Sequence, residues 1–572
     1  MNGPAKVLAC GMIFIGCSSG LDNGLAGLPP MGFSSWFAVA SEVTETFMKS
    51  NVAVLLSSGL AAKGYRHVNV DEGWMKGRNV TTGMFYEDLD MFPSGMKGFG
   101  DWVHRQGLLY GLYTSRGTCQ CTTPEYNKRA VPSKRSGQQP EGSQGFEEQD
   151  AHFFAEAGAD FIKEDSCCGS QNHAVAYGDY ARMRDALNRT GRPMVFSLCG
   201  WNPWYAPVGI SLANSWRISL DGNDWPAHID AINKMAAITH WTGPGGWNDP
   251  DFLIGPPGYP AVGGQSELQS RAQMSLWCIF PAPLFISMDL TRASPSLIAI
   301  LGNEEAIAVN QDRAARAGAR LVGGDLSPPF GNGLPAALAP CDASEALQRW
   351  DFAEASGGTP VGRLVRSAAG SAGRRCLNVL ECGSQVVYWD CATERPGMCA
   401  GGSNEEWTLA DGQLRSDMRA ASGPRGEAMC LGGSATRLTL VPCSGSSALP
   451  FVYDRETLQL RSGSGACLSA EGSGSTNIWA KQLADGAWAM VFLNTGAAAA
   501  DITCDVPNCI ARMGLAGVGA TLHLRDIWAH TDNGTISADS GITMRAVGAE
   551  AGVVFLRVTP AFKQHEQQLQ LV

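Results

Sequence analysis

The sequence predicts a multidomain protein with a (β/α)8 TIM barrel, an antiparallel β-domain after it, and a β-rich module inserted between the two. Three observations support this architecture. Eight short apolar runs alternate with helical patterns over residues 28–312, and polar residues close most of these runs. Beyond residue 312 long helical patterns stop, and glycine, proline and period-two alternation take over.

Composition excludes several classes of protein. The chain has 572 residues, which is more than one compact domain normally holds. Lys plus Arg is 43 and Asp plus Glu is 54, giving a formal net charge of −11. An acidic chain is a poor candidate for binding nucleic acid. Because no apolar run reaches the ~18 residues of a spanning helix, we do not expect an integral membrane protein.

The first 20 residues have the pattern of a secretory signal peptide. Lys6 precedes an apolar stretch over 7–15, and small residues follow it. We therefore expect a secreted, extracellular protein or one sent to a vacuole or lysosome-like compartment. Two alternatives remain for this segment: a buried first strand or helix, and a lipoprotein signal lipidated at Cys17.

Most of the 18 cysteines occur in close groups. In an exported chain, disulfides are the default explanation for such groups. Zinc is the rival explanation, but nine histidines and no paired CxxC motifs make it the weaker one, so no metal or cofactor is predicted. Asn79, Asn188 and Asn533 begin glycosylation sequons, which agrees with export.

The predicted barrel covers residues 21–315. Amphipathic stretches separate its strands; in one of them Met48, Val52, Leu55, Leu56 and Leu60 fall on one helical face. Eight βα units in this length match a TIM barrel. The predicted strands are 31–36, 67–71, 108–115, 160–165, 194–199, 215–221, 242–249 and 283–289.

Polar side chains gather at the carboxyl ends of the predicted strands. Examples are Asp71 with Glu72, Lys163 with Asp165, and Asp221. In a barrel these ends face one mouth, where active sites form. A buried carboxylate needs a partner or a function, so the pattern predicts a polar pocket at this mouth.

Residues 335–472 contain a loose internal repeat. Trp350 and Trp407 lie 57 positions apart, and Cys-Leu opens three segments at Cys376, Cys430 and Cys467. The pattern suggests a three-lobed β module and resembles the ricin-type β-trefoil. The resemblance implies disulfides Cys376–Cys391 and Cys430–Cys443. The family's sugar pockets carry Asp shortly after Cys-Leu. Here those places hold Asn378, Gly432 and Ser469, which weakens the expectation that this module binds carbohydrate.

The rest of the chain reads as an antiparallel β-domain over 474–562 with a terminal tail over 563–572. Apolar and polar residues alternate at period two in 488–492, 521–524 and 553–558. Such alternation is typical of strands with one buried face.

Two acidic side chains are candidates for glycosidic bond hydrolysis, which needs a pair of carboxylates facing one sugar. In Lys163-Glu164-Asp165 the first and third side chains share one side of a strand, so Lys163 should keep Asp165 ionised. Arg217 and Asp221 come from the sixth strand. Because neighbouring carboxylates push one pKa up, Asp221 could hold the proton of a general acid.

Several motifs, in order over about two-thirds of the chain, resemble glycoside hydrolase family 27, which holds α-galactosidases and α-N-acetylgalactosaminidases. They are residues 32–36 (GFSSW), 70–74 (VDEGW), 161–167 (FIKEDSC), 216–221, 243–251 (GPGGWNDPD), 282–287 (APLFIS), 310–312 and 525–528.

This resemblance implies a retaining α-galactosidase that acts by double displacement on a galactosyl oligosaccharide or glycoconjugate, without a metal. Asp165 matches the nucleophile and Asp221 the acid/base. Cys167 matches a cysteine bridged to the loop after the third strand, which offers Cys119 and Cys121. The residues that match the lining of the sugar pocket are Trp36, Asp71, Tyr113, Lys163, Arg217 and Asp251.

Two departures leave the substrate open. Galactosidases of the family have Asp-Asp where this chain has Asp71-Glu72, and the longer Glu72 could intrude on the sugar's CH2OH group. That change resembles the family's β-L-arabinopyranosidases, although one methylene discriminates by only ~1–3 kcal/mol. The chain also has Gly200-Trp201 where galactosidases have Glu for the 2-hydroxyl, which could open space for a 2-acetamido group and make the enzyme an α-N-acetylgalactosaminidase. Trp201, like Trp36, is expected to border the sugar. A non-enzymatic alternative is a secreted lectin on a degenerate hydrolase scaffold.

Overall fold

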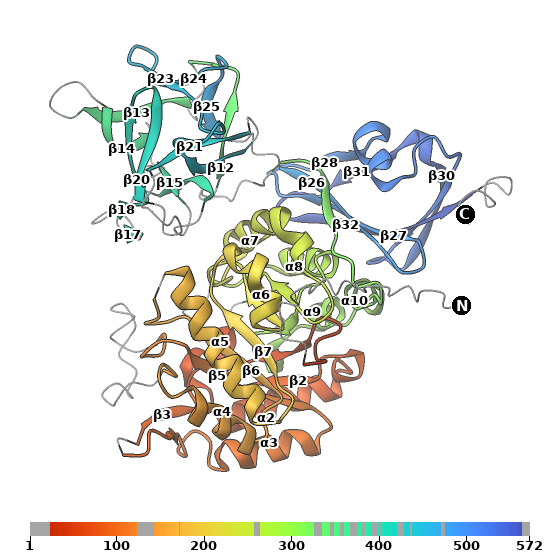
Figure 1. Ribbon diagram of the computed structural model, residues 1–572. Helices are drawn as coiled ribbons and strands as arrows, with labels where there is room; N and C mark the ends of the chain where they lie inside the picture. The colour runs from red at the N-terminus through yellow and green to blue at the C-terminus, as the bar shows by residue number, and fades with distance from the viewer. Residues whose placement is uncertain are drawn as a thin grey trace, which may run out of the picture.

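A parallel sheet of eight strands forms the first half of the computed structural model (Figure 1). The structure describes residues 23–79, 81–122, 142–170, 172–256, 263–324, 326 and 334–562, apart from 344–347, 355–359, 367–374, 380–383, 391–397, 400–401, 420–427, 435–436 and 471–474. The predicted signal peptide, the tail over 563–572 and Cys391 lie outside these residues.

Each of the eight predicted barrel strands is present, in the predicted order. An isolated parallel bridge from Leu253 to Ile286 links the two ends of the sheet. The sheet order is β10-β1-β2-β5-β6-β7-β8-β9. The strands are β1 (Met31–Ser34), β2 (His67–Asn69), β5 (Leu109–Ser115), β6 (Phe161–Asp165), β7 (Val195–Cys199), β8 (Ser215–Arg217), β9 (Trp247–Asp249) and β10 (Leu284–Ile286).

Helices connect these strands and bury their apolar faces against them. In α2, Met48, Val52 and Leu55 are buried, but Leu56 is 38% exposed. Leu56 was placed on the same helical face, but one further residue turns its side chain about 100° around the helix axis, away from the buried face. The helices are α1 (Trp36–Val39), α2 (Glu45–Ser57), α3 (Gly95–Arg105), α4 (Glu147–Glu156), α5 (His173–Arg189), α6 (Ala206–Leu212), α7 (Trp225–Ile238), α8 (Glu267–Ile279), α9 (Pro295–Leu301) and α10 (Glu304–Asn310); β3 (Met75–Arg78) and β4 (Phe85–Glu87) form a hairpin after β2.

The C-terminal domain is antiparallel, as predicted, and packs on the barrel. Phe280, just after α8, meets Trp479 of β26 edge to face with ring centroids 5.0 Å apart. Val491 and Phe555 belong to the same hydrophobic core as the barrel residues. Its six-stranded sheet runs β11 (Ala319–Val322), β26 (Thr476–Gln482), β27 (Trp488–Asn494), β32 (Gly552–Ala561), β29 (Thr521–Asp526) and β30 (Thr531–Ser537), and β28 (Ala500–Cys504) pairs with β31 (Ile542–Val547).

Between β11 and β26 the chain forms a separate all-β lobe around Trp350 and Trp407 (Figure 1). Its first strand pairs with its last, and a disulfide joins Cys341 to Cys467. The trefoil topology remains a prediction. The strands are β12 (Leu334–Ala339), β13 (Trp350–Glu354), β14 (Pro360–Arg366), β15 (Arg375–Val379), β16 (Val386–Asp390), β17 (Met398–Cys399), β18 (Gly402–Ser403), β19 (Glu406–Ala410), β20 (Gln413–Arg419), β21 (Ala428–Ser434), β22 (Arg437–Pro442), β23 (Phe451–Asp454), β24 (Gln459–Ser462) and β25 (Cys467–Ala470).

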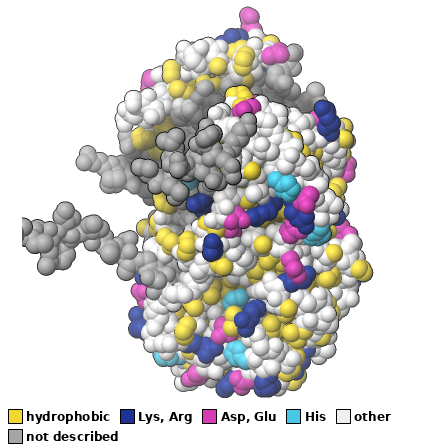
Figure 2. Space-filling model, turned by 90° about the vertical axis from the view of Figure 1, so that its right-hand side faces the viewer, with side chains coloured by type: hydrophobic (Ala, Val, Ile, Leu, Met, Phe, Trp, Pro, Cys, Tyr) yellow, Lys and Arg dark blue, Asp and Glu magenta, His cyan; other side chains and the backbone are white. Residues whose placement is uncertain are grey.

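The surface mixes charge signs. On the face drawn in Figure 2, acidic and basic side chains are interspersed with one another. Among the described residues, none of the helices combines the length and the apolar character needed to cross a membrane.

Candidate active site

The polar residues that the sequence analysis singled out lie at the carboxyl ends of the barrel strands. Lys163 and Asp165 belong to β6 and Arg217 ends β8, while Asp71 and Asp251 follow β2 and β9. All five are at least nine-tenths buried. Parallel strands place these ends on one side of the sheet, so side chains distant in sequence meet at the mouth.

Lys163 forms a buried ion pair with Asp71. Its ammonium lies 2.9 Å from Asp71 Oδ2, which also accepts a hydrogen bond from Ser34 Oγ. Burial alone would lower the pKa of Lys163, but the neighbouring acidic groups together outweigh it, Asp71 foremost and Asp165 among them, and the pKa is raised. The ammonium also lies 5.9, 5.2 and 5.1 Å from the ring centroids of Trp36, Tyr113 and Phe252. Aromatic walls and an ion pair thus bound one side of the pocket.

Asp165 is 6% exposed and held by two donors. The Ser166 N–H donates to Oδ1 at 2.8 Å, and Tyr113 Oη lies 3.1 Å from Oδ2. Burial raises the pKa of Asp165 to about 6 even though the Lys163 charge lowers it. Lys163 therefore favours the ionised form of Asp165, as expected, but burial outweighs this effect. The ion-pair partner of Lys163 is Asp71.

Arg217 links the second candidate carboxylate to the pocket. Its Nη2 lies 2.7 Å from Asp251 Oδ2 and 3.3 Å from Asp221 Oδ1. The Asp221 side chain is 46% exposed, and its charge is among those that raise the pKa of Asp165. The structure therefore brings Asp165 and Asp221 to the same mouth, with one buried and the other open to solvent.

Asp251 has a constrained backbone and a carboxylate with three contacts. Its φ is 88°, in the left-handed region that non-glycine residues seldom adopt. Oδ2 accepts from Gly222 N at 2.6 Å and Oδ1 from Phe252 N at 2.8 Å, in addition to the Arg217 contact. These bonds offset the strain and fix the backbone next to Asp221.

Glu72, the residue that was expected to narrow the pocket, is held by Thr122 and lies close to Tyr113. Thr122 N donates to Oε1 at 2.9 Å, the Thr122 hydroxyl donates to the same oxygen, and Tyr113 Oη lies 3.3 Å from Oε2. The extra methylene of Glu72 lets its carboxylate reach Thr122. The expected steric intrusion on a CH2OH group stays a prediction.

Gly200 does not open space, contrary to expectation. A Cβ built on Gly200 would lie 1.9 Å from Cε2 of Tyr205, a ring that is fully buried. The ring of Tyr205 fills the volume that a larger residue at position 200 would need. The next residue, Trp201, is partly exposed and has a φ of 59°.

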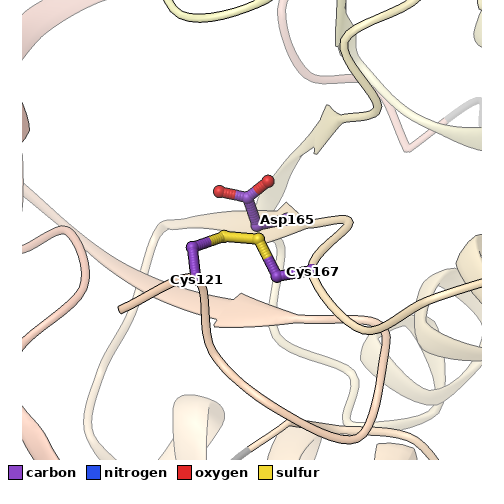
Figure 3. Close-up of side chains that lie close together, drawn as sticks. All are labelled: Cys121, Asp165 and Cys167. Atoms are coloured by element: carbon purple, nitrogen blue, oxygen red, sulfur yellow. A yellow bond between two sulfur atoms is a disulfide. The ribbon is translucent and has the colours of Figure 1, made fainter. Parts of the chain in front are cut away.

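Two disulfides tie the loop after β5 to the end of β6. Cys167 pairs with Cys121 and Cys168 with Cys119, which resolves the ambiguity left by the sequence. Figure 3 shows the Cys121–Cys167 bridge beside the Asp165 carboxylate. The three side chains are close enough to hold a metal, but both sulfurs are already bonded to each other and are not available as thiolate ligands.

The other disulfide predictions lie in the inserted lobe. The pair Cys430–Cys443 is confirmed. Cys376 is disulfide-bonded, and its expected partner Cys391 lies outside the described residues.

Sequence reasoning missed Thr122, Ser34 and Tyr205. Ser34 and Thr122 bind the acidic residues of the pocket, and Tyr205 fills the space beside Gly200. Ser34 lies within the motif 32–36, two residues before Trp36, and that motif could have indicated it. Thr122 is indicated by nothing except its position after Cys121.

Comparisons with known proteins agree with this geometry. Residues 38–312 match the alpha galactosidase A family, and 473–558 match the alpha galactosidase C-terminal beta sandwich domain. A probable alpha-galactosidase of Dictyostelium discoideum is 38% identical over 296 residues, 51% of this chain and 70% of that protein. Alpha-galactosidase 3 of Arabidopsis thaliana is 38% identical over 299 residues, 51% of this chain and 62% of that protein. The crystal structure of alpha-galactosidase I from Mortierella vinacea superposes with a TM-score of 0.59 at 22% identity, over 94% of this chain and 98% of that one.

The barrel, the acidic residues at its mouth and the sequence matches together identify the chain as a glycoside hydrolase. The chain belongs to the α-galactosidase family, glycoside hydrolase family 27.

Proposed function

We propose that this protein is a retaining α-galactosidase that removes terminal α-D-galactosyl residues from oligosaccharides or glycoconjugates. One observation carries the proposal. The mouth of the barrel holds two carboxylates that interact electrostatically, Asp165 and Asp221. Asp165 is buried near Lys163, and Asp221 is half exposed and contacts Arg217. A double displacement needs such a pair, with different environments for its two members.

In the first step, Asp165 attacks the anomeric carbon while Asp221 gives its proton to the glycosidic oxygen. The C1–O bond breaks, and a galactosyl ester forms on Asp165. Ser166 N–H and the Tyr113 hydroxyl hold the Asp165 carboxylate in place. With the pKa of Asp165 raised to about 6, this carboxylate is ionised at neutral pH and carries little solvation to be removed.

In the second step, Asp221 takes a proton from water, and the water oxygen displaces the Asp165 ester. Galactose leaves with its α configuration retained. Exposure of the Asp221 side chain suits this role, because both the leaving group and the incoming water reach it from solvent. Arg217 Nη2 donates to Asp221 Oδ1 at 3.3 Å and so orients the acid/base.

The terminal sugar is held by charged groups around the pocket. Asp71 and Lys163 on one side and Arg217 and Asp251 on the other offer charge-assisted hydrogen bonds to hydroxyl groups. Trp36 offers an aromatic wall beside Lys163. The pocket thus has both the polar and the apolar surface that a galactopyranose ring presents.

The relatives that the chain matches are α-galactosidases, which favours this activity over the two related ones. Exclusion of a CH2OH group by Glu72, which a β-L-arabinopyranosidase would require, stays a prediction. Room for a 2-acetamido group depended on Gly200, and the Tyr205 ring occupies that volume. We therefore place α-galactosidase first.

We also propose that the protein works outside the cytosol, in the extracellular space or in a vacuole or lysosome-like compartment. The bridges Cys119–Cys168, Cys121–Cys167 and Cys504–Cys509 support this location, because disulfides persist in oxidising compartments.

Asp165→Asn tests the nucleophile. We expect turnover of an aryl α-D-galactoside to fall to background with the circular dichroism spectrum unchanged, because the amide is not a nucleophile. For the wild type, NMR of the first product should show the α-anomer. Wild-type binding of galactosides without turnover would indicate the lectin alternative, and a first-formed β-anomer would exclude retention.

A further inference from the structure

The Tyr113 hydroxyl faces more acceptors than it has hydrogens. Its oxygen lies 3.1 Å from Asp165 Oδ2, 3.3 Å from Glu72 Oε2 and 3.3 Å from Cys121 Sγ. A phenol donates one hydrogen bond only. Burial raises the pKa of Tyr113, so the hydroxyl keeps its hydrogen. Whichever acceptor receives that hydrogen decides how the candidate nucleophile is held.

Glu72 is the neighbour that can settle this competition. It is 2% exposed, and both donors of Thr122 bind Oε1, which leaves Oε2 facing Tyr113. The charged groups that act on it are Asp71 on the same turn and Asp165 on β6. Lys163, the cation of this corner, pairs with Asp71.

A proton on Glu72 removes the repulsion between its carboxylate and those of Asp71 and Asp165. It also ends the competition between Glu72 and Asp165 for the Tyr113 hydrogen. Among the described residues, three carboxylates, Asp71, Glu72 and Asp165, share this corner with the ammonium of Lys163. With its proton on Oε2, Glu72 donates to Tyr113 Oη instead of competing for the Tyr113 hydrogen. Tyr113 then donates to Asp165 without a rival carboxylate.

We propose that Glu72 is a positioning residue that acts in its protonated form: it donates to the Tyr113 oxygen and so directs the Tyr113 hydrogen to Asp165. The inference rests on the proposed role of Asp165 as nucleophile. Glu72 itself does not touch the reacting atoms. It orients Tyr113, whose hydroxyl contacts the Asp165 carboxylate.

Protonation of Glu72 at neutral pH has a physical cause in burial, which raises its pKa to about 8 against the opposing effect of Thr122. Asp165 has its pKa raised to about 6. Between these values Asp165 is ionised while Glu72 is protonated. Above the upper value Glu72 ionises, competes for the Tyr113 hydrogen and adds a negative charge beside Asp165, so attack on the sugar slows.

Glu72→Gln is the direct test, because the carboxamide stays neutral, donates to Tyr113 through its nitrogen and accepts from Thr122 through its oxygen. The substrate is 2,4-dinitrophenyl α-D-galactopyranoside, whose leaving group departs without protonation. Ionisation of Asp221 therefore does not contribute to the alkaline limb, the fall of the glycosylation rate at high pH. The readout is the pre-steady-state rate of glycosylation against pH. At pH 9 the wild-type rate should be about tenfold below its value at pH 7, and the variant should lose this decline.

Two further variants separate positioning from a structural effect. Thr122→Val removes a hydroxyl donor that favours ionised Glu72, so the alkaline limb should move to higher pH. Glu164→Gln is the matched control, because it replaces another buried carboxyl on β6, next to Asp165. The Glu164 carboxyl oxygens make no hydrogen bond among the described residues. This variant should leave the alkaline limb where it is.

The proposal is overturned if Glu72→Gln keeps the alkaline limb, or if its acid limb moves to lower pH, since that shift would mean that Glu72 is charged in the working enzyme. Should Glu72→Gln fail to fold, an alkaline limb unmoved in Thr122→Val overturns the proposal instead. Loss of the proposed function would look different: the wild type would not release dinitrophenolate, or Asp165→Asn would remain active.

Discussion

Asp165 and Asp221 differ most clearly in exposure. Asp165 is 6% exposed and held by two donors, whereas the Asp221 side chain is 46% exposed and contacts Arg217. A nucleophile benefits from a fixed, weakly solvated carboxylate, and an acid/base must exchange protons with solvent. Both residues were predicted from the sequence. The partner of Lys163 was not, because strand alternation shows which side chains share a face but not which carboxylate on a neighbouring strand comes closest.

Asp221→Ala should affect substrates according to their leaving groups. General acid catalysis contributes about 10²–10⁴-fold. We therefore expect turnover of a galactosyl disaccharide to fall by that factor, while the glycosylation burst with the dinitrophenyl galactoside stays close to the wild-type rate. Rapid-quench kinetics on both substrates makes the measurement. Equal losses with both leaving groups would contradict the acid/base assignment.

At the scale of elements, the loop after β5 is fastened to the end of β6. The bridges Cys119–Cys168 and Cys121–Cys167 join the same two segments. They fix the loop so that Thr122, which follows Cys121, reaches Glu72. The strands themselves were predictable from short apolar runs closed by polar residues. The cysteine pairing was not, because two adjacent cysteines at each end allow either connectivity until the backbone is placed.

Removing both bridges should destabilise the protein much more than removing one. The sequence separations are 49 and 46 residues, and closing a loop of that length is worth about 4 kcal/mol. Either bridge alone keeps most of that constraint. Urea unfolding of the two double-serine variants and of the quadruple variant checks this. Additive losses would show that the two bridges act independently.

At the scale of the whole molecule, an all-β lobe interrupts the C-terminal sheet without separating its strands. β11 before the lobe still pairs with β26 after it, with Val322 opposite Ile478. The first and last strands of the lobe pair with each other, so the chain leaves and returns at one place. The composition change after residue 312 predicted such a module. Its carbohydrate binding stays a prediction.

Replacing residues 335–472 by a short Gly-Ser linker should leave the active site intact. The barrel and the C-terminal domain share one hydrophobic core that does not include the lobe. We expect kcat/KM for an aryl α-D-galactoside to remain within about threefold of wild type, because insertions at adjacent chain ends are tolerated. Calorimetry on the same variant reports its stability. A large loss of activity would mean that the lobe supports the catalytic domain.

Local signals along the chain predicted the barrel strands, the C-terminal β-domain and the acidic pair: the hydrophobic period, the carboxylates that close the strands and the ordered motifs. Three features became known from the fold alone: Lys163 pairs with Asp71, Thr122 holds Glu72, and the Tyr205 ring fills the space at Gly200. Each of these depends on distances between segments far apart in the chain. Such distances are set by how strands and loops pack together, and no spacing along the sequence encodes them.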